Sequence, residues 1–315
     1  MNDSPKHRDA YPRVVSLLPS ATETVCALGM GNCLVGRSHE CDFPSEVSTL
    51  PICTEAKLPL DASSADITKD IEAIVSEGLS IYRVHGERLA RLQPDLIITQ
   101  TQCEVCAVSS AEVEAAAREW LGAEVRILEL APWSLDDIWS AFVAIAEALG
   151  VEARGWALVE RCRQRMQEIS EKAAFCDERP RVATIEWIDP PMAGGNWMPE
   201  LVELAAGVNL FGEAGKHSPW LDWWALLDAD PDIILVVPCG FDLERSRREL
   251  PVLESKQGWR DLGAVRNGRV YLADGNAYFN RPGPRIVESL EILAEVLHPD
   301  VFAPKHLGMA YIRHT

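Results

Sequence analysis

Short runs rich in β-branched and apolar residues alternate with helix-favouring segments along most of this chain, and no other feature limits the fold as strongly. Strands that are separated by helices pair in parallel sheets, because each helix carries the chain back to the edge from which the next strand starts. The runs predict strands at residues 13–18, 33–38, 95–100, 124–130, 181–187, 232–237 and 269–274. The sequence therefore predicts an α/β fold.

The chain length and a central helical segment divide this fold into two lobes. A chain of 315 residues is too long for one ordinary hydrophobic core. Between the strand-rich halves, apolar residues from Ile138 to Ile169 recur at spacings of three and four, which predicts amphipathic helices that are broken at Gly150 or run through it. The predicted parts are an N-terminal lobe at 11–134, a linking helical segment at 135–175, a C-terminal lobe at 176–298 and a tail at 299–315.

The composition excludes several classes of partner. The formal net charge is −18, whereas nucleic acids and anionic membrane surfaces bind clustered Lys and Arg. The N-terminus shows no signal-peptide pattern and no segment is apolar enough to insert in a membrane, so we expect a cytoplasmic protein. The nine cysteines are odd in number and scattered, unlike the disulfide framework of a small secreted domain, so we expect free thiols.

The residues that follow each predicted strand are candidate ligand contacts, because ligands bind outside the carboxyl ends of the strands in an open parallel sheet. Several of these residues are aromatic and others are polar. Large planar side chains in loops suit a large, partly apolar small molecule that a few polar groups orient. The candidates are His39, Glu40, Cys41, Phe43, Gln102, Asn196, Trp197, Trp220, Tyr278, Asn280 and Arg281.

A second pattern is the pair Cys103 and Cys106, which follows the strand predicted at 95–100. A Cys-x-x-Cys pair is half of a structural metal site, and His39 with Cys41 could complete a site for zinc or another thiophilic metal. The alternative is that both cysteines are small buried thiols. The sequence contains no nucleophile elbow, phosphate-binding loop or dinucleotide-binding glycine motif, so we expect no enzyme.

The stretch RVVSLLPSATETVCALGMGNCLVGRSHECDFP at 13–44 resembles the opening of the class III periplasmic-binding-protein-like family, the substrate-binding proteins of vitamin B12, haem and siderophore importers. The resemblance continues through LARLQPDLIITQ, SPWLDWWALLDADPDIILVV and NRPGPRIVESLEILAEVL, and covers nearly the whole chain. The motifs SHECD-P and TQ-QC-VCAVS are similar to those of a signal-less cobalamin-binding subgroup. The family implies two Rossmann-like lobes joined by one long helix, with the ligand cleft between the lobes.

The resemblance also implies where the ligand and a transporter would be contacted. The ligand-binding positions of the vitamin B12 binder fall near Glu40, Tyr82, Gln100, Met192, Trp220, Tyr278 and Arg281. Glu40, Gln100 and Met192 stand where that protein has aromatic residues. Importer-docking members place one acidic residue on each lobe; Glu87 fits the first position, but the second falls at Trp223 or Trp224, which makes docking to an ABC permease doubtful.

The function expected from the sequence is non-catalytic binding of cobalamin, another corrinoid or a related large metal chelate by a cytoplasmic carrier, store or sensor. In this reading His39, Cys41, Cys103 or Cys106 could reach the cobalt. One alternative is a metal- or thiol-dependent enzyme or redox protein that uses the same loops. Another is a haem or siderophore binder of an ABC importer, although the negative charge and Glu40 disfavour anionic siderophores.

Overall fold

The contacts within the chain divide it into two α/β units. The computed structural model describes residues 11–314, apart from 60, 77–80, 102–109 and 122–124. Unit 1 comprises Met1–Lys57, Ile74–Ala131 and Trp139–Val159, and unit 2 comprises Leu58–Ala73, Pro132–Ile138 and Glu160–Thr315. Neither unit is therefore a continuous stretch of sequence.

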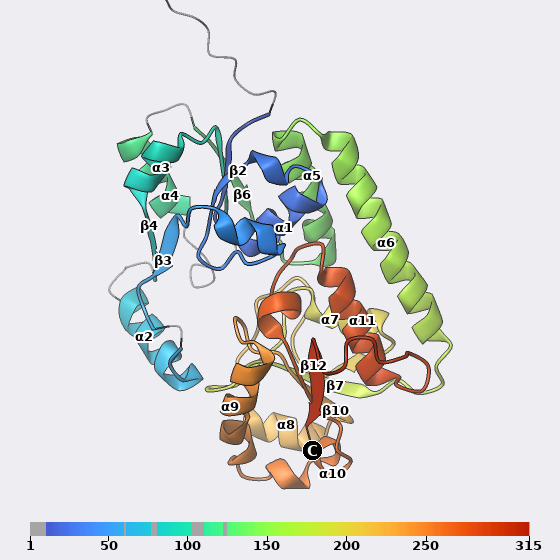
Figure 1. The fold of residues 1–315 in the computed structure, drawn as a ribbon. Coiled ribbons are helices and arrows are strands. Elements are labelled where there is room, and N and C mark those ends of the chain that lie inside the picture. The colour runs from blue at the N-terminus through green and yellow to red at the C-terminus, as the bar shows by residue number, and fades with distance from the viewer. Residues whose placement is uncertain (1–10, 60, 77–80, 102–109, 122–124, 315) are drawn as a thin grey trace, which may run out of the picture. The chain divides into compact units, whose positions relative to one another are not determined.

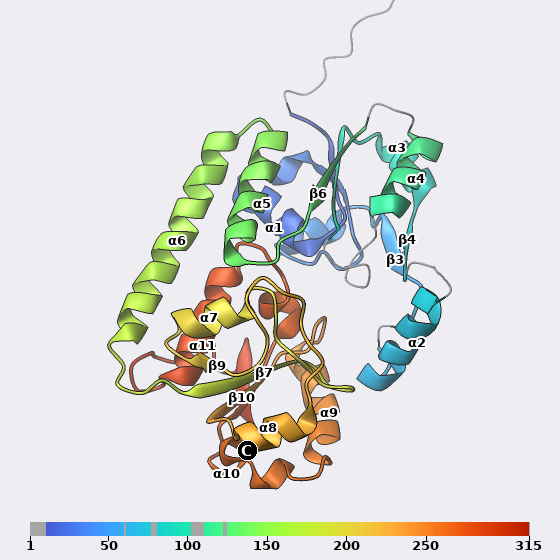
Figure 2. The same cartoon turned by 180° about the vertical axis from the view of Figure 1, so that it is seen from behind.

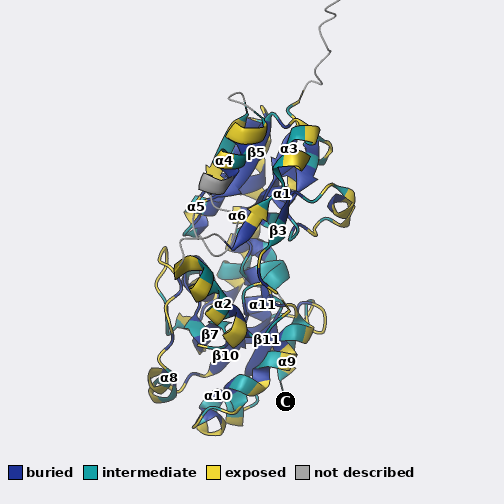
Figure 3. Ribbon diagram, turned by 90° about the vertical axis from the view of Figure 1, so that its left-hand side faces the viewer, coloured by how far each residue is buried: buried dark blue, intermediate teal, exposed yellow. Residues whose placement is uncertain are grey.

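Unit 1 contains a parallel sheet with the strand order β2-β1-β5-β6. Its strands are β1 (Val14–Ser16), β2 (Leu34–Arg37), β5 (Leu96–Gln100) and β6 (Arg126–Leu130). All residues of β1 and β5 are buried, as a parallel sheet covered on both faces requires. Figure 3 shows the β5 strand in the colour of buried residues.

Helices and a small antiparallel pair of strands complete unit 1. Helix α1 (Pro19–Ala27) begins at a proline. Proline suits this position because the first N–H groups of a helix have no partner within the helix, so the lack of an N–H costs nothing there. Helices α3 (Gly86–Leu92) and α4 (Ser110–Trp120) pack against each other (Figure 1). Strand β3 (Thr54–Ala56) pairs with β4 (Tyr82–Val84), and short 3₁₀ turns lie at Gly31–Cys33 and Ser45–Thr49.

The linking segment forms two helices, α5 (Leu135–Ala148) and α6 (Glu152–Ala174). The Ser134 hydroxyl donates to the Asp137 carboxylate at 2.9 Å, and the Asp137 backbone N–H donates back to that hydroxyl at 3.3 Å, which caps α5. Gly150 ends α5 in the left-handed region, with φ +72°. The boundary between the units falls inside α6, after Val159, which confirms the prediction of two α/β lobes joined by a long helix.

Helix α6 has 23 residues, which corresponds to roughly 34 Å at 1.5 Å per residue. Both α5 and α6 are visible along their length in Figures 1 and 2. Among the described residues, no helix combines the length and the apolar character needed to cross a membrane.

Unit 2 contains a mixed sheet with the strand order β12-β11-β10-β7-β8. The central strands β7 (Arg181–Trp187), β10 (Ile233–Val236) and β11 (Val270–Ala273) are parallel to one another. Strands β8 (Met192–Ala193) and β12 (Tyr311–His314) pair antiparallel at the two edges, and β9 (Val208–Asn209) pairs with the start of β7.

Helices cover the sheet of unit 2. They are α7 (Met198–Leu204), α8 (Trp223–Ala229), α9 (Leu243–Glu254), α10 (Gly263–Arg266) and α11 (Ile286–Leu297), with a 3₁₀ turn at Trp259–Asp261 and a π-helical turn at Gly275–Phe279. One hydrophobic core cluster packs Ile185, Ile234 and Leu272 of the strands against Leu253 and Trp259. Helices α7 and α11 pack against each other (Figure 2).

The insert between β3 and β4 carries helix α2 (Ser64–Ser76), and its first part makes contacts within unit 2. The Ser64 hydroxyl donates to the Glu249 carboxylate at 3.0 Å, and the Trp187 indole N–H donates to the Thr68 hydroxyl at 2.9 Å. Residues 58–73 therefore belong to unit 2, although the strands on both sides of the insert belong to unit 1.

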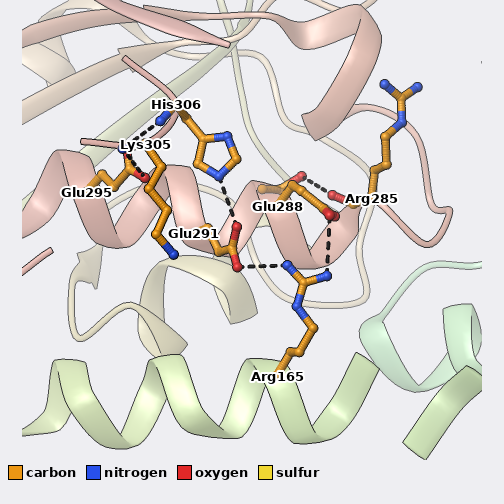
Figure 4. Close-up of polar contacts among 8 residues, drawn as sticks. Arg165, Arg285, Glu288, Glu291, Glu295, Lys305 and His306 are labelled. Atoms are coloured by element: carbon orange, nitrogen blue, oxygen red, sulfur yellow. Dashed lines mark hydrogen bonds and ion pairs between the residues drawn. The ribbon is translucent and has the colours of Figure 1, made fainter. Parts of the chain in front are cut away.

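Polar contacts join α6 to α11 and join α11 to the C-terminal segment (Figure 4). Arg165 donates to Glu291 at 2.7 Å, and the other oxygen of Glu291 lies 2.9 Å from His306 Nε2. The backbone N–H groups of Lys305 and His306 both donate to the Glu295 carboxylate at 3.1 Å. Beyond these contacts, β12 pairs with β11, so the segment that the sequence set apart as a tail contributes a strand to the sheet.

Candidate functional site

The buried side chain of Arg37 binds the backbone of the loop that follows β2. Its guanidinium donates to the carbonyl oxygens of Ser38 at 3.0 Å, Cys41 at 2.9 Å and Ser48 at 3.0 Å. Hydrogen bonds from a charged donor are stronger than neutral ones, so these contacts fix the path of the loop at the carboxyl end of the strand.

His39 stands on this loop and is held by Thr54 of β3. The His39 backbone N–H donates to Thr54 Oγ1 at 3.1 Å, and the ring nitrogen Nδ1 lies 2.8 Å from the same oxygen. The other ring nitrogen, Nε2, is buried without a hydrogen-bond partner. Burial, reinforced by the charge of Arg37, lowers the pKa of His39, so the imidazole is neutral at neutral pH.

Two further candidates gather beside His39. The imidazole and the Tyr82 ring lie with their centres 5.6 Å apart, and the Tyr82 hydroxyl donates to the Glu40 carboxylate at 3.5 Å. Phe43, at the end of the same loop, leaves 45% of its surface exposed. The structure thus brings Tyr82 beside His39 and Glu40, which are adjacent on one loop, with an exposed aromatic ring on the same loop.

The Cys41 thiol points into unit 1. Its residue is 1% exposed, and the Thr22 hydroxyl donates to Sγ at 3.1 Å. Burial also raises the pKa of Cys26 and Cys53 to about 11, which keeps them as thiols rather than reactive thiolates. Buried, protonated thiols of this kind are chemically inert.

The predicted metal site receives no support from the described residues. Within them, no three or more His, Cys, Asp or Glu side chains are grouped so that they could hold a metal ion. Cys103, Cys106 and Gln102 lie outside the described residues. Zinc and other thiophilic metals therefore remain a prediction without a structural argument.

In unit 2, a polar cluster lies at the carboxyl end of β7. The Ser218 hydroxyl donates to the Glu186 carboxylate at 2.9 Å, and the Gly195 N–H donates to the Ser218 oxygen at 3.1 Å. A Cβ on Gly195 would lie 2.6 Å from the Ser218 nitrogen, so only glycine lets the two chain segments approach this closely. Asn196 follows in the left-handed region, with φ +52°.

Glu186 and Ser218 were missed from the sequence. Glu186 is the second-last residue of β7 and follows four buried residues, Val182 to Ile185; a carboxylate at that position is the one signal that could have pointed to it.

Met192 and Trp220, far apart in the sequence, meet in an isolated antiparallel bridge. The Trp220 residue is 59% exposed, whereas Trp197 is 5% exposed and its indole N–H donates to the Phe279 carbonyl at 3.0 Å. Of these two predicted aromatic contacts, Trp220 is accessible and Trp197 is part of the packing of unit 2.

The turn after β11 holds the last three candidates. The Asn280 amide nitrogen donates to the carbonyl oxygens of Val237 and Gly275, each at 3.0 Å. Arg281 is buried and donates to the Asn276 side chain at 2.9 Å. Tyr278 is partly exposed. The Asn280 and Arg281 contacts shape the turn that presents Tyr278.

The candidates therefore sort by exposure, and their roles in ligand binding stay predictions. Two are exposed: Phe43 and Trp220. Six are partly exposed: His39, Glu40, Met192, Asn196, Tyr278 and Asn280. Five are buried: Cys41, Tyr82, Gln100, Trp197 and Arg281.

Two relatives match the chain over most of its length. An uncharacterised ABC transporter substrate-binding lipoprotein of Bacillus subtilis is 25% identical over 295 residues, which is 92% of this chain and 81% of the relative. A vitamin B12-binding protein of Vibrio cholerae is 24% identical over 283 residues, which is 89% of this chain and 86% of the relative.

A solved structure shares the fold. The periplasmic haem-binding protein of Roseiflexus sp. RS-1 superposes with a TM-score of 0.67 at 23% identity, and the match covers 92% of this chain and 98% of that chain. At this identity the likeness establishes the fold.

A family model described as periplasmic binding protein matches residues 14–277. The prediction of a cytoplasmic location is therefore wrong, because the family and the lipoprotein relative point away from the cytoplasm. The prediction of a non-enzymatic binder is confirmed by the same matches. The chain belongs to the periplasmic binding protein family and is a substrate-binding protein.

Proposed function

We propose that the ligand is a corrinoid or a closely related large metal chelate, and that residues in the strand-end loops contact it. The observation that carries this proposal is the match over 89% of the chain to a protein named as vitamin B12-binding. It is supported by the kinds of side chain at the strand ends. Exposed aromatic rings, Phe43 and Trp220, accompany polar groups such as Glu40 and Asn196, as a large ligand with an apolar ring and polar edges requires.

Charge favours a corrinoid over an anionic chelate. The net charge of the chain is −18, and Glu40 adds a carboxylate among the candidate contacts. Corrinoids carry neutral amide groups around the macrocycle, whereas haem carries carboxylates and ferric siderophores are commonly anionic. A negative site repels such ligands, so the corrinoid is the better electrostatic match.

Haem is the second candidate, because the structural neighbour from Roseiflexus is named as haem-binding. A neutral imidazole such as that of His39 is also a common partner of haem iron.

We further propose that the protein delivers its ligand to an ABC transporter, in line with the name of the Bacillus relative. The expectation that such docking is doubtful rested on Trp223 and Trp224 standing where an acidic residue was expected. The relatives weaken that argument. On unit 1, the Glu87 side chain is 70% exposed and paired with Arg91 at 3.3 Å, so it is open to a partner.

Titration of the purified chain with cyanocobalamin, dicyanocobinamide and haemin, followed by absorbance and by calorimetry, tests the ligand. We expect saturable binding of both corrinoids and weaker binding of haemin. Saturable binding of haemin alone would favour haem as the ligand. If neither corrinoid gave heat or a spectral change, the corrinoid proposal would be wrong.

A further inference from the structure

One ring nitrogen of His39 is left unused by the protein. Nδ1 lies 2.8 Å from the Thr54 hydroxyl, while Nε2 is buried and has no hydrogen-bond partner. A buried polar atom without a hydrogen-bond partner costs free energy, so such an atom in a native structure calls for an explanation.

The Thr54 contact decides which nitrogen carries the proton. If Nδ1 carries it, Nδ1 donates to Thr54 and Nε2 keeps a lone pair. If Nε2 carries it, an N–H donor is buried with no acceptor, which native proteins avoid more strictly than an unused acceptor. The first tautomer is therefore favoured, with the lone pair on Nε2.

This arrangement is the one in which proteins present histidine to a metal. One nitrogen is fixed by a hydrogen bond, and the other offers its lone pair. Cys41 on the same loop differs, because its sulfur already accepts a hydrogen bond from Thr22 at 3.1 Å. Among the candidates that the structure describes, His39 is the one with a buried side-chain nitrogen or oxygen that has no hydrogen-bond partner.

A metal inside a chelate also fits the surroundings of His39 better than a bare ion. Across the described residues, no group of three or more metal-binding side chains is present, so a bare ion would lack ligands. A metal that is already held by a macrocycle brings its equatorial ligands with it and needs one further donor from the protein.

We propose that His39 Nε2 supplies the axial nitrogen to the metal of the bound chelate. This inference rests on the proposed function. The Nε2 lone pair forms the bond to the metal as water, or the ligand's own base, leaves the axial position, and no electron or proton is transferred. Thr54 is a positioning residue, since it orients the ring. Nε2 is buried and the centre of the Tyr82 ring lies 5.6 Å from that of the imidazole, so the bond requires neighbouring side chains such as Tyr82 to move as the ligand enters.

Cobinamide, a corrinoid without an appended lower base, is the probe that isolates this bond. After reduction to the cobalt(II) form, one axial nitrogen nucleus splits each cobalt line of the electron paramagnetic resonance spectrum into a triplet, whereas axial water does not. The wild-type complex is expected to show the triplet. His39→Gln keeps a side-chain group near Thr54 but lacks the ligating ring; it is expected to bind cobinamide about tenfold more weakly, without the triplet.

His85→Gln is the matched control. His85 lies in the same unit, 3.8 Å from Glu55 of β3, and the same substitution there should leave both affinity and triplet unchanged. Thr54→Val should retain the triplet with a reduced affinity, because the ring is still present but less firmly oriented.

The results separate the two proposals. A wild-type complex that binds cobinamide without a triplet, or a triplet that persists in His39→Gln, would overturn the inference and leave the corrinoid proposal standing. A wild-type chain that binds neither cobinamide nor cyanocobalamin would overturn both.

Discussion

Trp220 and Trp197 were both predicted to contact the ligand, yet the structure gives them opposite surroundings. Trp220 is 59% exposed at the Met192 bridge, and Trp197 is 5% exposed with its indole N–H bonded to Phe279. We expect Trp220→Ala to weaken ligand binding with little effect on folding, and Trp197→Phe to do the reverse.

The size of each effect follows from the exposed surface. A tryptophan buries up to about 250 Å², so an exposed fraction of 59% leaves about 150 Å² that a ligand could cover. A flat ligand against one face would cover about half of it, and about 75 Å² at about 25 cal/mol per Å² gives about 2 kcal/mol. This free energy corresponds to a roughly twentyfold rise in Kd.

For Trp197→Phe the cost falls on stability. Removing the indole N–H leaves the Phe279 carbonyl unpaired in a buried place, which lowers the free energy of unfolding by about 1–3 kcal/mol. An exposed side chain such as Trp220 contributes less than about 0.5 kcal/mol.

Cyanocobalamin titration followed by calorimetry measures Kd, and urea unfolding followed by circular dichroism measures stability. If Trp220→Ala binds with an unchanged Kd, Trp220 is not a ligand contact. If Trp197→Phe is as stable as the wild type but binds weakly, the assignment of roles by exposure is mistaken.

Three further predictions concern stability and local order. Burial lowers the pKa of His298, whose Nε2 bonds the Ala205 carbonyl at 2.9 Å, so its contribution to stability is present above the unfolded pKa of about 6.5 and is lost as pH falls below it. The urea midpoint should therefore fall between about pH 7.5 and pH 5.5 more steeply in the wild type than in His298→Gln, and equal slopes would contradict the reasoning. Thr68→Val removes the acceptor of the Trp187 indole N–H, so hydrogen exchange in α2 should speed up by about fivefold while Thr49→Val, at an exposed turn, has no effect there; unchanged exchange in α2 would show that this bond does not hold the helix. Gly195→Ala places a Cβ against the backbone at Ser218 and should lower the free energy of unfolding by about 2 kcal/mol or more in the same urea assay, whereas a neutral result would mean that the loop yields freely.

The sequence predicted those elements that have either a continuous apolar run, as in the buried strands, or apolar residues at helical spacing, as in α5 and α6. Every predicted strand is present, and α5 and α6 occupy the predicted segment with their break at Gly150. The strands that escaped prediction are β3, β4, β8, β9 and β12, each of two to four residues. Such short runs contain too few residues for an alternating pattern to stand out from turns.

Side-chain roles at the candidate site were harder to predict, because position after a strand does not determine which way a side chain points. Cys41 and His39 are two residues apart on one loop, yet the thiol is turned inward to Thr22 and the imidazole is held at Thr54. The partners of both lie on other elements, and the sequence of the loop records neither.

The assignment of residues 58–73 and 132–138 to unit 2 has a practical consequence for dissecting this protein. A fragment that begins at Glu160 would lack the donors that bond Glu249 and Glu200, namely Ser64 and the backbone N–H of Leu135. Truncation at the middle of α6 would therefore yield a defective unit 2 rather than an independent domain. Residues 1–159 contain every segment of unit 1, and residues 58–315 contain every segment of unit 2. A fragment that is to keep all the contacts of unit 2 must therefore begin at or before Leu58, and the two minimal fragments overlap over residues 58–159.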